Sequence, residues 1–292
     1  MSHFAIFVIG PNVDEQLVPY HEFESTGDDN QYVKEVDITA ECKEKGLDYY
    51  DLENKTIIDV AQLDLADKHK YGYALVDGNG ALIRAVRRTN PNAQWDWYQI
   101  GGRFSDWFKL KPDATGFKGT RSWTNAAEPT DPTRADAALK CDIDFEAMRD
   151  EAGNEAAVNW DKARALLSAA VAPTQWDSWE HLRDVVHKGD IETARKAYHA
   201  QPSVKVLANF AGFFDTGDKY IQSREEFVQR ARDHACVPYA LVNKGEWTGR
   251  GKVGWFGVSD DKVALDDWCQ LVNQLLDNLP GNTLITVVDC HI

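Results

Sequence analysis

The sequence lacks the signatures of the common catalytic and nucleotide-binding sites. It contains no G-x-S-x-G, Walker A, G-x-G-x-x-G, H-E-x-x-H or H-x-E…P-C-x-x-C pattern. Its five cysteines are odd in number, widely spaced and never in a C-x-x-C pair, which excludes a disulfide framework and a zinc ribbon and favours a reducing compartment. We therefore expect no catalytic residue, no metal and no cofactor, and we favour a binding protein over an enzyme.

Positive charge and long apolar runs are also scarce. The net charge of −15 argues against a groove for nucleic-acid backbone and suits a protein that meets a basic partner surface. No segment approaches the roughly 20 apolar residues of a membrane span, and the first apolar run is too short for a signal peptide. Neither repeats nor heptads occur, which argues against a virion structural component. We expect a cytosolic protein that binds neither nucleic acid nor membrane directly.

Tryptophan, by contrast, is abundant, with ten residues, and the segment Trp95–Phe108 holds six aromatic residues in fourteen. Its only interruption, Gly101-Gly102, predicts a β-hairpin in which Ile100 faces Arg103. Two interpretations stay open: a packed core hairpin, or an aromatic platform from which Arg103 contacts a partner. We expect Trp97 to lie in the core. The candidate partner-binding residues are Trp95, Arg103, Trp107 and Trp123.

The fold class follows from the apolar pattern. The segments 4–9 and 283–292 are apolar on both faces, which is typical of strands in the middle of a covered sheet. Residues 73–76 and 81–86 flank the turn sequence Asp77-Gly-Asn-Gly80 and predict a second hairpin. We predict an α/β (α+β) fold whose mixed or mostly antiparallel sheet is formed from both chain ends and the central hairpins.

The predicted helices suggest how the domains are arranged. Helices are expected over 144–171, from Asp177, from Asp190, from Ser223 and over 265–279, and the proline-containing segment 111–142 is expected to form an exposed arm. A long loop is expected between strands at 239–242 and 254–258. The prediction is a core of residues 1–110 and 201–292, with residues 111–200 inserted as a polar arm and helical segment.

Three weaker constellations remain. Cys290 and His291 are adjacent, but neighbouring residues on a strand point to opposite faces, so they would not readily share a site. His234 and Cys236 are the other thiol–imidazole pair. A carboxylate cluster around Glu22–Asp29 could in principle hold Mg²⁺, although such clusters more often cap turns or face solvent. The remaining histidines, His3 among them, are expected to be ordinary surface or core residues.

Four segments carry a resemblance. They are Met1-Ser-His-Phe with Val8-Ile-Gly10, Leu17 with Pro19-Tyr-His-Glu-Phe-Glu-Ser-Thr-Gly27, Trp95-Asp-Trp-Tyr with Gly101-Gly-Arg103, and Val288-Asp-Cys-His-Ile292. They resemble a group of uncharacterised phage and prophage proteins, while residues 111–172 are unmatched. Length and character are also similar to the Gabija anti-defence proteins of phages. That similarity implies a stoichiometric inhibitor, in the host cytoplasm, that assembles around a bacterial nuclease–helicase defence complex and blocks its access to DNA. It assigns no contact residue.

Two functions therefore stay open. The first is a non-enzymatic, phage-encoded inhibitor of a bacterial defence complex, whose acidic surface meets a basic DNA-binding surface. The second is a protein or enzyme that binds a nucleotide-like small molecule, with the Trp95–Phe108 segment stacking on a base. We also expect a dimer or larger homo-oligomer, because a chain with ten tryptophans and a polar arm has the means to self-associate.

Overall fold

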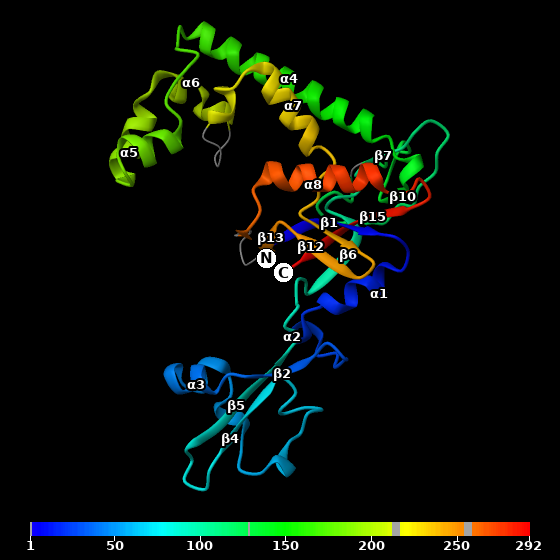
Figure 1. Cartoon of the computed structure of the whole chain (residues 1–292), viewed down its shortest axis with the longest axis vertical. Coiled ribbons are helices and arrows are strands. Elements are labelled where there is room, and N and C mark those ends of the chain that lie inside the picture. Colours follow the sequence, from blue (N-terminus) through cyan, green and yellow to red (C-terminus); the bar gives the residue numbers. More distant parts are fainter. Residues whose placement is uncertain (1, 128, 212–216, 254–258) are drawn as a thin grey trace. The chain divides into compact units, whose positions relative to one another are not determined.

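The structure is a computed structural model that describes residues 2–127, 129–211, 217–253 and 259–292 (Figure 1). The chain divides into two compact units. Unit 1 comprises Met1–Ile143, Pro238–Ala264 and Pro280–Ile292, and unit 2 comprises Asp144–Val237 and Leu265–Leu279. The fold class is α+β, with mixed and antiparallel open sheets, as predicted. Among the described helices, none has the length and apolar character needed to cross a membrane.

The two ends of the chain form the middle of the main sheet in unit 1. Strands β1 (His3–Ile9) and β15 (Leu284–His291) pair antiparallel along their lengths, with His3 opposite His291 and Ile9 opposite Ile285 (Figure 1). The sheet has the order β12-β11-β1-β15-β6-β8, and β10 (Ala137–Leu139) also pairs with β15. The other strands are β11 (Ala240–Asn243), β12 (Glu246–Gly249), β6 (Trp97–Gly102) and β8 (Thr120–Arg121).

Side chains alternate across this sheet as the strand period requires. On one face Phe4, Ile6 and Val8 pack with Val288 and Cys290 in a buried cluster. The alternate residues lie on the other face, where Phe7 packs against the rings of the segment that follows β6. Both faces are therefore covered, which explains why the two terminal strands read as continuously apolar.

A second sheet in unit 1 has the order β2-β5-β4-β3. The predicted hairpin is confirmed as β4 (Gly72–Val76) and β5 (Leu82–Thr89), and the Asp77 carboxylate accepts hydrogen bonds from the N–H groups of Asn79 and Ala81 in its turn. The partners are β2 (Lys34–Asp37) and β3 (Thr56–Ile57). The short helices of unit 1 are α1 (Val13–Leu17), η1 (Val18–Tyr20), α2 (Phe23–Thr26), α3 (Thr39–Lys45), η2 (Asp48–Tyr50), η3 (Glu53–Lys55), η4 (Val60–Gln62) and η5 (Lys140–Asp142).

The predicted Trp95–Phe108 hairpin is wrong. Strand β6 pairs with β15 on one side and with β8 on the other, whereas β7 (Phe108–Lys109) pairs with β9 (Arg134–Ala135). Gly101 and Gly102 are the last two residues of β6 and both have a positive φ. A Cβ at Gly101 would lie 2.6 Å from an Asp136 oxygen, and one at Gly102 would lie 2.5 Å from Asp289. The missing side chains of the two glycines thus leave room for two buried carboxylates, and the glycines are not the central residues of a hairpin turn.

The segment expected to be an exposed arm is attached to the main sheet. Strands β8, β9 and β10 all fall within residues 111–143, and all of these residues belong to unit 1. They are held because β10 pairs with β15 and because Asp136, which is 1% exposed, accepts hydrogen bonds from two backbone N–H groups. The domain boundary in the structure therefore falls after Ile143, and not at residue 110.

Unit 2 is helical. Its elements are α4 (Phe145–Ala169), η6 (His181–Val186), α5 (Ile191–Ala200), α6 (Pro202–Ala211), η7 (Asp218–Tyr220), α7 (Arg224–His234) and α8 (Leu265–Asn278). Asp144 and Asp190 cap α4 and α5, and Ser223 forms the predicted capping box with Glu226 at the start of α7. Helices α4 and α7 lie side by side, joined by ion pairs from Arg232 (Figure 1). Residues 201–237 and α8, which were expected in the core with the sheet, therefore belong to this unit.

Two further expectations concern the C-terminal part of unit 1. The strand predicted at 239–242 is β11, and the segment predicted as a long loop contains β12, which pairs antiparallel with it. The strand predicted at 254–258 lies outside the described residues. Strands β13 (Gly251–Val253) and β14 (Ser259–Asp261) form a separate two-stranded ribbon.

Candidate functional site

Arg103 and Trp123 lie together at the ends of two neighbouring parallel strands. Gly101 and Gly102 of β6 pair with Thr120 and Arg121 of β8, and the Ser122 N–H donates to the Gly102 oxygen at 3.2 Å. The chain then continues as Arg103 from one strand and as Trp123 from the other. We call the surface formed by Arg103, which follows β6, and by residues 122–125, which follow β8, the strand-end surface.

Both of these side chains are available to a partner. Trp123 is 85% exposed, and Arg103 is exposed with a guanidinium that has no partner among the residues that the structure describes. The turn that carries Trp123 is fixed, because the Asn125 amide donates to the Gly102 oxygen at 3.1 Å and Arg121 donates to the Asn125 oxygen at 3.2 Å. A large indole is thus presented to solvent from an anchored backbone.

The other tryptophans of the segment are placed differently. Trp95 is 7% exposed in the apolar cluster under the main sheet, and its Nε1 donates to the Leu17 oxygen, so it is not available to a partner in this fold. Trp107 is half-buried and packs edge-on against Phe7. The expectation that Trp97 lies in the core is wrong, because its side chain is 43% exposed at the start of β6. The faces assigned to these aromatic residues assumed the hairpin register, and because the hairpin does not form, that assignment of buried and exposed rings fails.

Buried carboxylates hold the backbone of this site. Asp289, which is fully buried, accepts the Arg103 N–H at 2.8 Å through one oxygen. Asp136 accepts the N–H of Asp106 at 2.5 Å and that of Gly119 at 2.7 Å, and burial raises its pKa above the usual value. Asp106 in turn forms ion pairs with Lys118 and Arg121. The loop from Arg103 to Asp106 is consequently tied to β8, to β15 and to Asp136 between β9 and β10.

Three rings from the three central strands pack against one another beside this loop. His3 is opposite His291, and His291 is opposite Trp97. The Trp97 ring stacks on His291 with centroids 5.2 Å apart, and the edge of the His3 ring lies 5.0 Å from His291 and 5.4 Å from Trp97, centroid to centroid. We call these three residues the ring cluster.

Each imidazole of the ring cluster is held by a carboxylate. His3 Nδ1 donates to Asp289 Oδ1 at 2.8 Å, and His291 Nδ1 donates to Asp96 Oδ1 at 2.6 Å. Both side chains are more than nine-tenths buried. Sequence reasoning missed this arrangement, since His3 and His291 are at opposite ends of the chain. The signal that could have found it was the alternation of Asp289 and His291 on a terminal strand expected to pair with the other terminal strand.

The buried thiols are not nucleophiles. Cys290 lies in the apolar cluster on the opposite face from His291, and burial raises its pKa well above the usual value. Burial likewise raises the pKa of Cys236 to about 12. A thiol that stays protonated at neutral pH is a poor nucleophile, so neither thiol–imidazole pair found in the sequence forms a reactive site.

Two of the carboxylates near Glu22 form ion pairs with arginines of β5. Glu24 pairs with Arg87 at 2.7 Å, and Asp29 pairs with Arg88. Burial raises the pKa of Glu22 above its usual value, with Glu24 nearby adding to the effect. No group of three or more His, Cys, Asp or Glu side chains suited to a metal ion occurs among the described residues.

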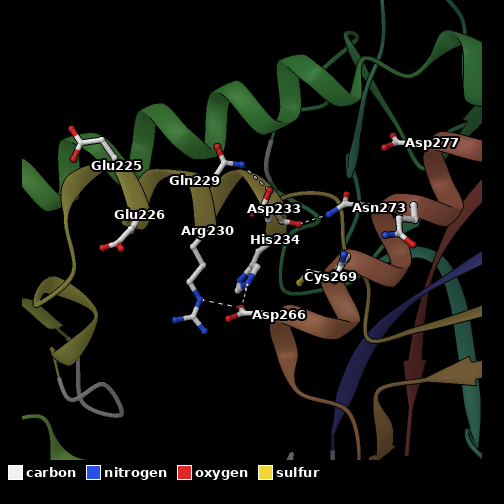
Figure 2. Close-up of a pocket in the computed structure, with 12 residues that line it drawn as sticks. Glu225, Glu226, Gln229, Arg230, Asp233, His234, Asp266, Cys269, Asn273 and Asp277 are labelled. Atoms are coloured by element: carbon white, nitrogen blue, oxygen red, sulfur yellow. Dashed lines mark hydrogen bonds and ion pairs between the residues drawn. The ribbon is translucent and has the colours of Figure 1, made fainter.

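Unit 2 contains a groove of about 830 Å³ between α7 and α8 (Figure 2). Its charged lining includes five carboxylates, from Glu225, Glu226, Asp233, Asp266 and Asp277. Arg230 and His234 pair with Asp266 at 3.2 and 3.1 Å, and Figure 2 shows both side chains pointing to it, so the basic groups of the groove are already paired. These ion pairs fasten the end of α7 to the start of α8, which is a structural role.

Comparison of the chain with protein-family models, with curated proteins and with solved structures found no match. Function must therefore be argued from the site itself. In unit 1 the strand-end surface offers an exposed indole and a cation that is unpaired within the described part of the chain, and the ring cluster offers two oriented imidazoles beside a half-exposed indole.

Proposed function

We propose that this chain is a non-enzymatic binding protein that recognises a partner protein through the strand-end surface. The observation that carries the proposal is that an 85% exposed Trp123 and an exposed Arg103, which has no partner among the described residues, follow adjacent strand ends on an anchored backbone. Tryptophan and arginine are the residue types most enriched at interface hot spots, and a fixed backbone lowers the entropy lost on binding.

The chemistry of the two side chains describes the partner. Arg103 calls for a carboxylate on the partner, since a guanidinium binds a carboxylate through two parallel hydrogen bonds. Trp123 calls for an apolar recess beside it. The overall charge of −15 favours approach to a basic protein surface, such as one that binds DNA.

The partner class we propose is a bacterial anti-phage defence complex of the Gabija type, a nuclease–helicase assembly whose access to DNA the bound protein would block. The support is the resemblance of the terminal and central segments to phage proteins, together with the acidic character of the chain. The proposal places the protein in the host cytoplasm and includes self-association into a dimer or larger homo-oligomer.

The test is binding of the tag-free protein to purified candidate complexes, measured by biolayer interferometry and by light scattering after size exclusion. We expect Arg103→Ala and Trp123→Ala each to cost about 2 kcal/mol or more of affinity with little change in melting temperature. Tyr49→Ala is the matched control, because Tyr49 is a 66% exposed aromatic residue in η2 of the same unit. If both variants are stable and bind as tightly as the wild type, the strand-end surface does not contact the partner.

A second candidate is supported by the 43% exposed ring of Trp97, which stacks on His291 and leaves part of the indole open to a flat ligand. A nucleotide-like small molecule would place its base on this ring. Saturable quenching of tryptophan fluorescence by nucleotides, lost in Trp97→Phe and Trp97→Ala but kept in Trp123→Ala, would favour this candidate over the first.

A further inference from the structure

A pocket of about 600 Å³ lies in unit 1 and is lined by residues of α2, η2, η3 and β5. Its lining includes the buried apolar side chains of Ile38 and Leu52 and the rings of Tyr50 and Tyr71. Sites for small molecules have volumes of roughly 300–1,000 Å³ and combine apolar and aromatic walls with a few polar groups. The size and the lining of this pocket match that description.

The Glu24–Arg87 ion pair in the lining is incomplete. A carboxylate and a guanidinium frequently join through two parallel hydrogen bonds, one to each oxygen. Here Nε and Nη2 of Arg87 both donate to Oε1 of Glu24, at 3.1 and 2.7 Å. Within the described part of the chain, Oε2 of Glu24 is buried without a hydrogen-bond partner, and Nη1 of Arg87 has no acceptor. The pair therefore keeps one acceptor and one donor for a further molecule.

The unpartnered oxygen calls for an explanation, because buried polar atoms are normally satisfied. Glu24 lines the pocket, and the terminal torsion of a glutamate covers a broad range, so its carboxylate can turn towards a donor in the pocket. Arg87 lines the same pocket, and 51% of its side chain is exposed. A ligand that satisfies both groups must carry a donor and an acceptor side by side on one edge.

The charges of the lining cancel. Lys55 pairs with Asp51 at 2.6 Å, and Arg87 pairs with Glu24 at 2.7 Å. These two pairs leave no excess charge to attract a free anion or cation. The net charge of −15 on the whole chain also repels phosphorylated compounds. A neutral ligand is therefore favoured over a charged one.

Guanine combines the required properties. Its flat ring stacks on aromatic side chains, and its Watson–Crick edge carries the O6 acceptor beside the donors N1–H and N2–H₂. Arginine commonly donates to O6 of guanine, and a carboxylate accepts from N–H groups.

We propose that this pocket binds a neutral purine of the guanine type, as the base or the nucleoside. The ring would lie against Tyr50 and Tyr71, O6 would accept from Arg87, and the N–H donors would bind Glu24. None of the residues that line the pocket belongs to the strand-end surface or to the ring cluster. The inference therefore does not depend on the proposed partner binding.

The experiment titrates the full chain with guanosine by isothermal titration calorimetry. We expect one guanosine per chain and a weaker affinity for guanosine 5′-monophosphate, whose phosphate the acidic chain repels. Glu24→Gln should lower the affinity for guanosine about tenfold or more, because it removes the charged acceptor. Tyr71→Ala should lower it about fivefold or more, because it removes a stacking ring. Glu35→Gln is the matched control, since Glu35 also pairs with an arginine of β5, Arg84, but lies outside the pocket, and it should bind as the wild type does.

A change in the ligand guards against variants that fail to fold. 1-Methylguanosine has no donor at N1, so the unmodified chain should bind it about tenfold or more weakly than guanosine. Absence of binding at millimolar guanosine would overturn the proposal, and so would equal affinities for the two nucleosides. Binding that persists in a folded Glu24→Gln variant but is lost in Trp97→Ala would place the nucleoside on the ring cluster and likewise overturn it.

Discussion

Gly102 packs directly against the side chain of Asp289. A Cβ on the glycine would lie 2.5 Å from a carboxylate oxygen of Asp289. Asp289 in turn accepts the N–H of the next residue, Arg103, at 2.8 Å. The glycine also has a φ of +55°, which costs other residues about 1–2 kcal/mol. The absence of a side chain at Gly102 thus allows Asp289 to pack against the end of β6 and to accept the Arg103 N–H.

The first prediction follows from that contact. Gly102→Ala should lower the free energy of unfolding by about 2 kcal/mol or more, because backbone strain and displacement of Asp289 act together. Chemical denaturation of the purified variant measures the effect. Gly78→Ala is the control, since nothing lies within 4 Å of a Cβ there, and it should change stability by less than about 0.5 kcal/mol. Equal stability of the two variants would show that a side chain at position 102 does not disturb Asp289.

The second prediction compares two tryptophans two residues apart. Trp95→Ala should cost about 3–5 kcal/mol, because its ring is 7% exposed within the core. Trp97→Ala should cost clearly less, since 43% of its side chain is already in water. Denaturation curves for both variants decide the order, and a larger loss in Trp97→Ala would mean that the ring cluster, and not the core, dominates here.

Local patterns predicted much of this fold. The two terminal strands, the hairpin at Asp77, the capping box at Ser223 and the apolar stripe of α8 each depend on neighbouring residues, and each is present. The failure at Gly101-Gly102 has a different cause. Glycine permits a positive φ both in a tight turn and where a distant side chain approaches the backbone, and only the tertiary structure reveals Asp136 and Asp289.

The candidate site was predicted less completely for the same reason. Exposure of Arg103 and Trp123 depends on β8 lying beside β6, and a two-residue strand leaves no periodic pattern in the sequence. His3 and His291 are 288 residues apart in number but opposite each other in the sheet. Sequence reasoning placed both terminal strands in one sheet without aligning their registers, so the two imidazoles were not connected.

The third prediction concerns thiol reactivity. Cys141 is exposed, whereas Cys42, Cys236, Cys269 and Cys290 are buried. We expect iodoacetamide at pH 8 to modify Cys141 alone in the native protein, as read by peptide mass spectrometry, because burial also keeps Cys236 and Cys290 protonated. All five should react after unfolding in urea. Rapid native labelling of Cys290 would show that the β1–β15 pairing opens readily.

The last prediction concerns pH and Asp136. Burial raises the pKa of this carboxyl above the unfolded value of 3.8, so the folded protein binds its proton more tightly than the unfolded chain does. Its contribution to stability is therefore fully present below pH 3.8 and is lost as the pH rises through the folded pKa. Asp136→Asn removes this titration, although its amide cannot accept from both Asp106 and Gly119 and will cost stability at every pH.

The informative quantity is therefore the difference in unfolding free energy between the wild type and Asp136→Asn, measured by urea denaturation in steps from pH 3.5 to 7. We expect the advantage of the wild type to shrink as the pH rises, because ionising a carboxylate that is 1% exposed costs the folded state more than the unfolded chain. Asp131→Asn is the control of opposite sign. Hydrogen bonds from Thr133 lower the pKa of Asp131, so its contribution should be lost as the pH falls. An advantage at Asp136 that grows with pH would mean that the two backbone N–H groups outweigh the cost of burial.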